Sequence, residues 1–388
     1  MHHHPRPVDR SFWSPGVLVM LGLMLAGGAA LAARFTGGLG YATNLSDSTP
    51  WGIWIGLDVA SGVALAAGGF TTAALAHVFG RHNYEAVTRP ALLTAALGYT
   101  FVAFAIFVDI GRSWAIWKPM FFHNYNSALF EVAMCVMTYL TVLWIEMIPI
   151  LAEKFGGRVP LLAWLDRKLG TFMWFFIILG VVLSCMHQSS LGTLLVIAPT
   201  KLHALWYTPM LPLLFLLSAF AVGYPMVIAE TTIATSSLKL DGEMHVLSPL
   251  SKFTIATLGI YMAVKIVDLA YRGALGLAFS GTAQANSFLV EMGLGVILPW
   301  TLLLFPAVRR SRRGLFIIAL LIVGGVLLNR LNVFVIGFSP QTAASPYYPA
   351  IGEVLITLGA IATIMFLYRV FVTLTPVLSA PKQEEVSS

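Results

Sequence analysis

The sequence predicts an all-α protein that crosses a membrane about ten times. Of its 388 residues, 58% are hydrophobic and only 10% are charged, whereas soluble domains average about 45–50% and about 25%. So few charges could not cover the surface of a soluble protein of this length. The chain also contains ten long apolar stretches, and about 20 such residues in a helix cross the hydrocarbon core of a bilayer.

The ten expected spans follow one another with short connections, and their backbone is best accommodated in lipid as helices. They cover residues 16–34, 51–79, 90–111, 125–150, 170–188, 205–230, 253–272, 286–306, 314–335 and 350–373. No connection has room for a soluble domain, so we expect one membrane domain over residues 1–388. The first span follows a basic start like a signal peptide, but its apolar stretch exceeds the usual length of about 7–15 residues, which favours a retained helix.

The positive charges predict the orientation of the chain. Sixteen Lys and Arg residues, including Arg10 and Lys382, fall on the side of both termini, and six fall on the other side. Such an excess marks the cytoplasmic side, so we expect both termini in the cytoplasm of a bacterial inner membrane. The net charge of +6 therefore reads as an orientation signal and does not indicate nucleic-acid binding.

An internal repeat organises the middle of the chain. Residues 126–131 and 286–291 match at four of six positions, at an offset of 160. The aspartate-containing ends of the preceding spans, residues 108–112 and 267–272, match at nearly the same offset. Because the matching spans run in the same direction, the repeat is parallel. It predicts two parallel-related four-helix bundles, 51–188 and 205–335, with flanking helices at 16–34 and 350–373.

Ionisable residues inside spans cost about 2.5–3.5 kcal/mol each at a helix centre, which makes each of them a candidate for function. Most lie toward the outer ends of the spans: Asp58, Asp109, Glu131, His187, Asp268, Glu291 and Glu353, with Arg112 and Arg272 beside them. Toward the cytoplasmic ends lie His77, Glu146 and Glu230. The outer half is therefore expected to be the more polar one.

Each candidate also has a purely structural interpretation. Asp109 with Arg112, and Asp268 with Arg272, have the spacing of helix-end ion pairs. Glu131 is expected two turns inside its span, with no adjacent cation in its own helix. It is either a protonated, hydrogen-bonded carboxyl with a structural role or a functional residue. Lys265 is expected to reach the interface or to pair with Asp268.

Three further groups of polar residues complete the set of candidates. Glu146 and Glu353 lie near span ends and are expected to be hydrated. His187 begins a run with Gln188 and two serines that supplies several hydrogen-bond donors and acceptors. Tyr99 lies mid-span, where its hydroxyl needs a partner.

The histidines argue against haem in this chain. A bis-histidine haem needs two ligands facing each other at one depth, and the nine histidines offer no such pair inside the spans. The two cysteines, Cys135 and Cys185, form no CxxC motif. We therefore expect neither haem nor an iron–sulfur cluster in this chain, so electrons must come from a partner.

Several motifs together resemble a known family. They are Trp51-Gly52-Ile53-Trp54, Arg89-Pro90-Ala91-Leu92-Leu93, Val108-Asp109-Ile110-Gly111-Arg112, Asn126-Ser127 with Glu131, and Met186-His187-Gln188-Ser189-Ser190. They are similar to the HybB-type membrane subunit of nickel–iron hydrogenases, within the NrfD-like group of quinone-interacting membrane proteins. The resemblance covers most of the chain, and the last span matches only in general character.

The resemblance implies a quinone site near the outer face and an iron–sulfur, ferredoxin-like partner subunit. That partner would connect to periplasmic large and small nickel–iron hydrogenase subunits. The resemblance also carries Tyr99, Glu131, His187 and Glu230 onto positions that the family associates with quinone or proton handling. With Asp109, these are the expected proton-transfer residues.

The sequence thus predicts a quinone-reactive subunit, taking menaquinone or ubiquinone, of a respiratory hydrogenase-type complex in the lipid membrane. The expected quinone contacts are Asp58, Asp109, Arg112, Asn126, His187 and Gln188. Alternatives are a subunit serving a polysulfide, nitrite or cytochrome-linked donor, a proton-coupled secondary transporter, and a bare membrane anchor.

Overall fold

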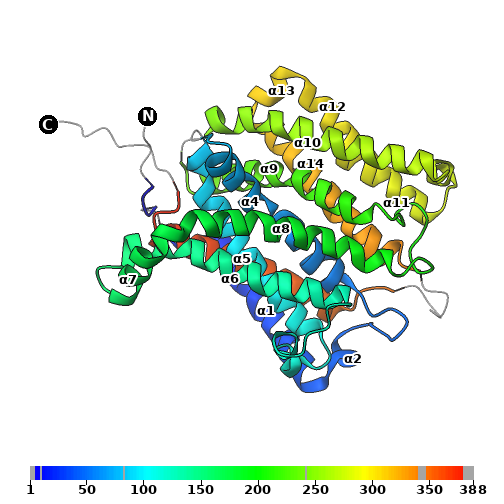
Figure 1. Ribbon diagram of the computed structural model, residues 1–388, viewed down its shortest axis with the longest axis horizontal. Helices are drawn as coiled ribbons and strands as arrows, with labels where there is room; N and C mark the ends of the chain where they lie inside the picture. Colours follow the sequence, from blue (N-terminus) through cyan, green and yellow to red (C-terminus); the bar gives the residue numbers. More distant parts are fainter. Residues whose placement is uncertain (1–4, 9–10, 82–83, 241–242, 340–346, 379–388) are drawn as a thin grey trace.

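The computed structural model describes residues 5–8, 11–81, 84–240, 243–339 and 347–378 (Figure 1). Within these ranges the secondary structure is helical, without a strand, and ten helices are long and apolar enough to span a membrane. The predicted fold class and span number are confirmed. Arg10 and Lys382, which contribute to the charge bias, lie outside the described residues.

Six of the ten spans are single unbroken α-helices flanked by loops, and a seventh, α8, follows the short helix α7. The six unbroken spans are α1 (Pro15–Gly37), α5 (Glu85–Asp109), α6 (Ala128–Phe155), α9 (Leu211–Ser237), α10 (Met244–Tyr271) and α15 (Ile351–Leu374), and α8 covers Met173–Val196. The helix α8 extends eight residues beyond the predicted end at 188, so His187 lies inside the helix.

Three spans contain π-helical turns. The second consists of η1 (Trp54–Val59), α3 (Ala60–Leu65), α4 (Ala67–Ala73) and η2 (Ala74–Val78). The eighth consists of α11 (Ala283–Met292), η8 (Gly293–Ile297) and α12 (Leu298–Leu304), and the ninth of α14 (Arg312–Leu331) and η9 (Asn332–Ile336). Such turns are frequent at functional sites. Here one includes Asp58, one begins two residues after Glu291, and one begins at Asn332.

The second span and α9 form the centre of the molecule, with most of their residues buried. Small residues allow the two backbones to approach closely. A Cβ atom on Gly68 would lie 3.2 Å from the carbonyl oxygen of Gly223 on α9. This contact joins the first half of the chain to the second.

The flanking helices α1 and α15 pack against each other along their length. The chain ends are tied together at the same side, since the N–H of Val8 donates to the carbonyl of Val372 at 3.1 Å. Within the first half α6 packs on α8 and α4 on α5, and within the second half α10 and α14 pack on α9. The grouping of these helices into two four-helix bundles remains a prediction.

Candidate functional site

A polar face of α8 is the centre of the site in the first half of the chain. His187 is completely buried, and its Nδ1 lies 3.1 Å from the hydroxyl of Tyr99 on α5. The ring of Tyr99 meets that of Tyr139 on α6 edge-on, with centroids 4.5 Å apart. The structure thus brings together two predicted site residues that are 88 positions apart in the sequence.

Gln188 continues this face and links α8 to the second span. Its Nε2 donates to the carbonyl of Val63 at 2.7 Å, which fixes the side-chain amide. The Oε1 of Gln188 and the Nε2 of His187 are buried, and neither has a hydrogen-bond partner among the described residues. Leaving a buried polar atom unpaired costs about 1–3 kcal/mol, so this pair of atoms indicates a place where a polar ligand or water binds.

Glu131 on α6 meets this face of α8 at Ser190, but its setting differs from the prediction. It occupies the first turn of α6 and is exposed, where two turns of depth and burial were expected. The reason is that α6 begins at Ala128, capped by Ser127, three residues later than the predicted span. The Oγ of Ser190 donates to Glu131 at 2.5 Å, so this carboxyl connects the polar face of α8 to the outer end of the helices.

Asp58 and Asp109 lie toward the flanking helices. The hydroxyl of Thr357 on α15 donates to Asp58 at 2.7 Å. Asp109 ends α5, and its buried Oδ1 has no partner among the described residues. The expected pair of Asp109 with Arg112 is absent from the described ion pairs, and Arg112 is exposed.

The cation near Asp109 is Arg34 from α1. Its guanidinium donates to the carbonyls of Val108 and Ile110 at 2.9 Å each, on either side of Asp109. The end of α5 leaves these carbonyls without helical partners, and the arginine satisfies them. Arg34, from a helix distant in sequence, is therefore the cation bonded to the end of α5, where the spacing had predicted Arg112.

Glu353, expected to be hydrated, is fully buried at the start of α15. Its carboxyl accepts the N–H of Asn44 at 3.1 Å, the N–H of Ala350 at 2.8 Å and the hydroxyl of Tyr347. Burial raises the pKa of the Tyr347 hydroxyl. The prediction of a hydrated residue was wrong because the loop before α15 folds over the carboxyl.

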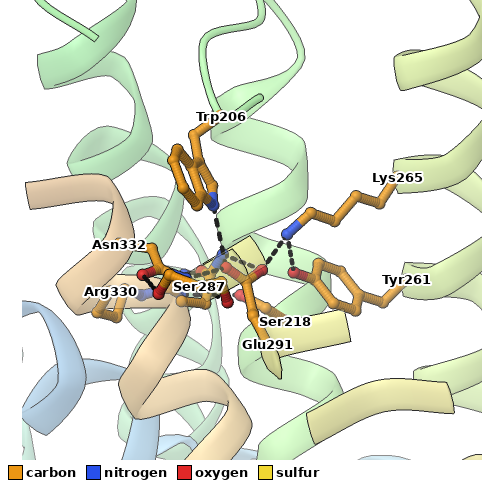
Figure 2. A network of polar contacts seen from close by, with 9 residues as sticks. Trp206, Ser218, Tyr261, Lys265, Ser287, Glu291, Arg330 and Asn332 are labelled. Carbon is orange, nitrogen blue, oxygen red and sulfur yellow. Dashed lines mark hydrogen bonds and ion pairs between the residues drawn. The ribbon is translucent and has the colours of Figure 1, made fainter. Parts of the chain in front are cut away.

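The second half of the chain holds a buried polar network around Glu291 (Figure 2). Lys265 on α10 forms an ion pair with Glu291 and also donates to the hydroxyl of Tyr261 at 3.1 Å. Three neutral donors complete the shell of this carboxylate: Trp206 Nε1 at 3.0 Å, Asn329 Nδ2 at 2.9 Å and Asn332 Nδ2 at 2.7 Å. The expectation that Lys265 would reach the interface or pair with Asp268 was wrong.

Asp268 instead pairs with Arg272, as its spacing predicted, at 2.8 Å. It also accepts the hydroxyl of Thr208 at 2.7 Å. With Asp268 already paired, Lys265 is free to turn inward to Glu291. A cavity of about 10 Å³, the size of one water, is lined by both Lys265 and Asp268.

Arg330 on α14 adds a second buried cation to the network. Its guanidinium donates to Asn329 at 2.6 Å and Ser218 at 2.8 Å, and lies 3.7 Å from the ring centroid of Phe215. Its Nε has no partner among the described residues. Lys265 contacts Glu291 directly and Arg330 is linked to it through Asn329. The network thus holds two cations and one carboxylate, and the Phe215 ring partly compensates the excess positive charge through its π face.

A larger cavity, of about 210 Å³, lies between α4, α5, α6 and α8 toward the side of the chain ends. Its lining includes Arg89, Tyr139 and Glu146. Glu146, which was expected near a hydrated span end, is half-buried and borders this cavity. Gly180 makes room for it, since a Cβ atom there would lie 2.8 Å from the Glu146 Oε1.

The predicted residues therefore divide into four sets. Tyr99, His187, Gln188 and Glu131 meet along α8, and Asp58 and Asp109 lie by the flanking helices. Arg112 and Asn126 are exposed and have no place in either cluster. Glu230 lies on α9 with a buried Oε1 that has no partner among the described residues.

The network around Glu291 was largely missed from the sequence. The repeat indicated Glu291, but nothing in the sequence indicated Trp206, Asn329 or Asn332. These three come from a loop and the ninth span, and only folding brings them to one carboxylate.

The comparisons with known proteins bear on this arrangement. A family model described as "Polysulphide reductase, NrfD" matches residues 42–339. The chain is 34% identical to a "Probable Ni/Fe-hydrogenase 2 b-type cytochrome subunit" of Escherichia coli (strain K12), over 99% of this chain and 98% of the relative. It is 26% identical to a "Menaquinone reductase, integral membrane subunit" of Nitratidesulfovibrio vulgaris, over 87% of this chain and 82% of the relative.

The name of the Escherichia coli relative, a b-type cytochrome subunit, contradicts our expectation that this chain carries no haem. That expectation required two facing histidines, whereas a haem iron can be held by a single histidine. Among the described residues His187 is the one buried histidine, and its Nε2 has no hydrogen-bond partner. If a haem is bound by this chain, His187 is the residue that would hold it, and the haem would supply one-electron transfer.

Proposed function

This chain belongs to the NrfD family of membrane subunits, and on that premise we propose that it exchanges electrons and protons with a membrane quinone. It is a multi-pass membrane protein related to subunits of hydrogenase and reductase complexes. The proposed role is the quinone-reactive subunit of a respiratory complex of the hydrogenase type.

One observation carries the proposal: two unpaired polar atoms lie on adjacent buried residues, His187 Nε2 and Gln188 Oε1. If the Tyr99 hydroxyl donates to Nδ1, the imidazole carries its hydrogen on Nε2 and can donate to a quinone carbonyl. The Gln188 oxygen can accept a hydrogen bond from a quinol hydroxyl. Together the two atoms complement both redox forms of the same ligand.

Quinone reduction also requires two protons, and titratable groups lead away from this pair. On one side Ser190 bonds to the exposed Glu131. On the other, Tyr99 contacts Tyr139, which borders the cavity that Glu146 lines. We propose that Glu131 exchanges protons with the outer side, and that Asp109 and Glu230 belong to the same proton-handling set.

The electrons would come from a partner with iron–sulfur clusters. The Escherichia coli relative is named for a nickel–iron hydrogenase and the Nitratidesulfovibrio vulgaris relative for menaquinone reduction. These names support a hydrogenase as the electron donor and menaquinone as the acceptor. The alternative is another respiratory donor, supported by a 26%-identical relative named as a putative dimethyl sulfoxide reductase membrane subunit.

The central experiment substitutes His187 by Gln in the assembled complex and measures donor-driven quinone reduction in membranes. We expect quinone turnover to fall at least tenfold with subunit levels unchanged. The matched control is His123→Gln, an exposed histidine in the loop before α6 that should retain normal turnover. Normal turnover in His187→Gln would refute the proposed contact between His187 Nε2 and the quinone. A haem absorbance band that the substitution abolishes would also refute it, because the haem iron would then be bound to Nε2.

A second experiment tests the role of Glu131. Because Glu131 is exposed and bonds only to Ser190 among the described residues, Glu131→Gln should leave assembly intact while slowing proton-coupled turnover. The control is Glu153→Gln, an exposed acid on the same helix paired with Arg89. Equal turnover in the two variants would remove Glu131 from the mechanism.

The proposed orientation places both chain ends in the cytoplasm of a bacterial inner membrane. Reporter fusions within residues 309–313 should then read cytoplasmic, and fusions near residues 118 and 201 should read periplasmic. The reverse pattern would contradict the charge bias from which the orientation was inferred.

A further inference from the structure

A short helix outside the bundle carries an inference independent of the quinone site. This helix, α7 (Pro160–Leu169), connects the end of α6 to the start of α8. Proline at its first turn and Gly170 at its end make it a separate element. In Figure 1 it projects beyond the ends of α6 and α8.

The position of α7 is fixed by the two spans that it joins. Both α6 and α8 cross the membrane, so a ten-residue helix between their neighbouring ends must lie at the membrane surface. None of its residues is buried. Because four spans precede it from the N-terminus, it lies on the side of the chain ends.

The exposed face of α7 combines apolar and basic side chains. Leu161 and Trp164, three residues apart, are 60% and 53% exposed. Arg167 and Lys168, one turn further, are also exposed. A tryptophan beside lysine and arginine is typical of the level where acyl chains meet headgroups.

The charge around α7 is strongly one-sided. Lys154, in the last turn of α6, and Arg158, in the turn before α7, are exposed as well, which brings four cations to this segment. Of its two acids, Glu153 is held by Arg89 at 2.8 Å, so Asp166 alone opposes them. Four cations at a membrane surface complement the negative charge of phospholipid headgroups.

We propose that α7 and the preceding turn form a binding surface for anionic phospholipid. Leu161 and Trp164 enter the acyl-chain boundary, while Arg158, Arg167 and Lys168 hold the phosphates. The occupant is a lipid such as phosphatidylglycerol or cardiolipin. Lipid binding at this cytoplasmic end of the first half of the chain therefore depends on the lipid composition of the leaflet.

The test uses the full chain with its copurifying subunits, reconstituted in phosphatidylethanolamine nanodiscs with increasing brominated phosphatidylglycerol. Bromine quenches nearby tryptophans, and comparison with Trp164→Phe isolates the contribution of Trp164. We expect brominated phosphatidylglycerol to quench Trp164 more strongly than the same fraction of brominated phosphatidylethanolamine.

Charge variants then test what holds the lipid. Each surface cation contributes about fivefold to the binding of anionic lipid, so the triple variant R158Q/R167Q/K168Q should shift the titration midpoint on the order of 100-fold. The control is K252Q/R310Q/R313Q, which removes the same charge from exposed cations elsewhere on this side. Its midpoint should stay within about twofold of the unmodified chain.

Three results would overturn the proposal. Equal quenching by both brominated lipids would show that α7 has no charge preference. An unchanged midpoint in the triple variant would assign the preference to other residues. Quenching by neither lipid would show that another subunit covers α7.

Discussion

The ion pair between Lys265 and Glu291 makes a quantitative prediction about stability. Both side chains are nearly inaccessible, 5% and 1% exposed. Removing one partner of a buried ion pair costs about 3–5 kcal/mol, because the other charge is left uncompensated. The two single variants, Lys265→Met and Glu291→Gln, should therefore both be destabilised, but by different amounts.

The hydrogen bonds around the pair determine the order. In Lys265→Met, Glu291 keeps Trp206, Asn329 and Asn332 as donors, and hydrogen bonds to a charged group are worth about 1.5–3 kcal/mol each. We therefore expect a loss near the lower limit, about 3 kcal/mol. In Glu291→Gln, the new amide N–H₂ group faces other hydrogen-bond donors, and Lys265 keeps only the Tyr261 hydroxyl as a partner. We therefore expect a larger loss of stability, about 4–5 kcal/mol.

The double variant Lys265→Met/Glu291→Gln removes both charges and should lose less than the two single variants together. Neutral replacement of a buried pair is often tolerated, and contacting residues show coupling energies of about 0.5–3 kcal/mol. We expect the coupling here near the upper end of that range. The control is Lys252→Met, an exposed lysine on the same helix.

The assay is thermal unfolding of the detergent-solubilised chain. At about 2 °C per kcal/mol for a large chain, we expect the unfolding midpoint to fall by about 6 °C in Lys265→Met and about 8–10 °C in Glu291→Gln. The reasoning would be refuted if the single variants unfolded like Lys252→Met. It would also be refuted if the losses in the double variant were additive.

Two further predictions rest on close backbone approaches. A Cβ atom on Gly27 of α1 would lie 2.8 Å from the Cα of Gly359 on α15. Gly27→Leu should therefore separate the flanking helices and abolish a disulfide engineered across them, whereas the control Gly28→Leu, at an exposed glycine, should preserve the disulfide. Gly180→Ala should displace the Glu146 carboxyl from its position beside α8 and slow proton-coupled quinone turnover at least threefold. Unchanged turnover, with normal subunit levels, would exclude Glu146 from the proton route.

The sequence by itself determined the properties that depend on one segment at a time. Hydropathy and length sufficed for the ten spans and the all-helical class, because each helix satisfies its own backbone hydrogen bonds in lipid. The spacing of Asp268 and Arg272 sufficed for their ion pair, because both residues lie on one helix.

Only the tertiary structure decided which partner each polar side chain finds. Lys265 pairs with Glu291 across two helices, and Arg34 from the first span, not Arg112, bonds to the end of α5. A helix places its residues on all sides, and the packing of neighbouring helices then selects which side is buried. A shift of three residues in the start of α6 was enough to move Glu131 from the interior to the surface, and no local pattern specifies such a boundary.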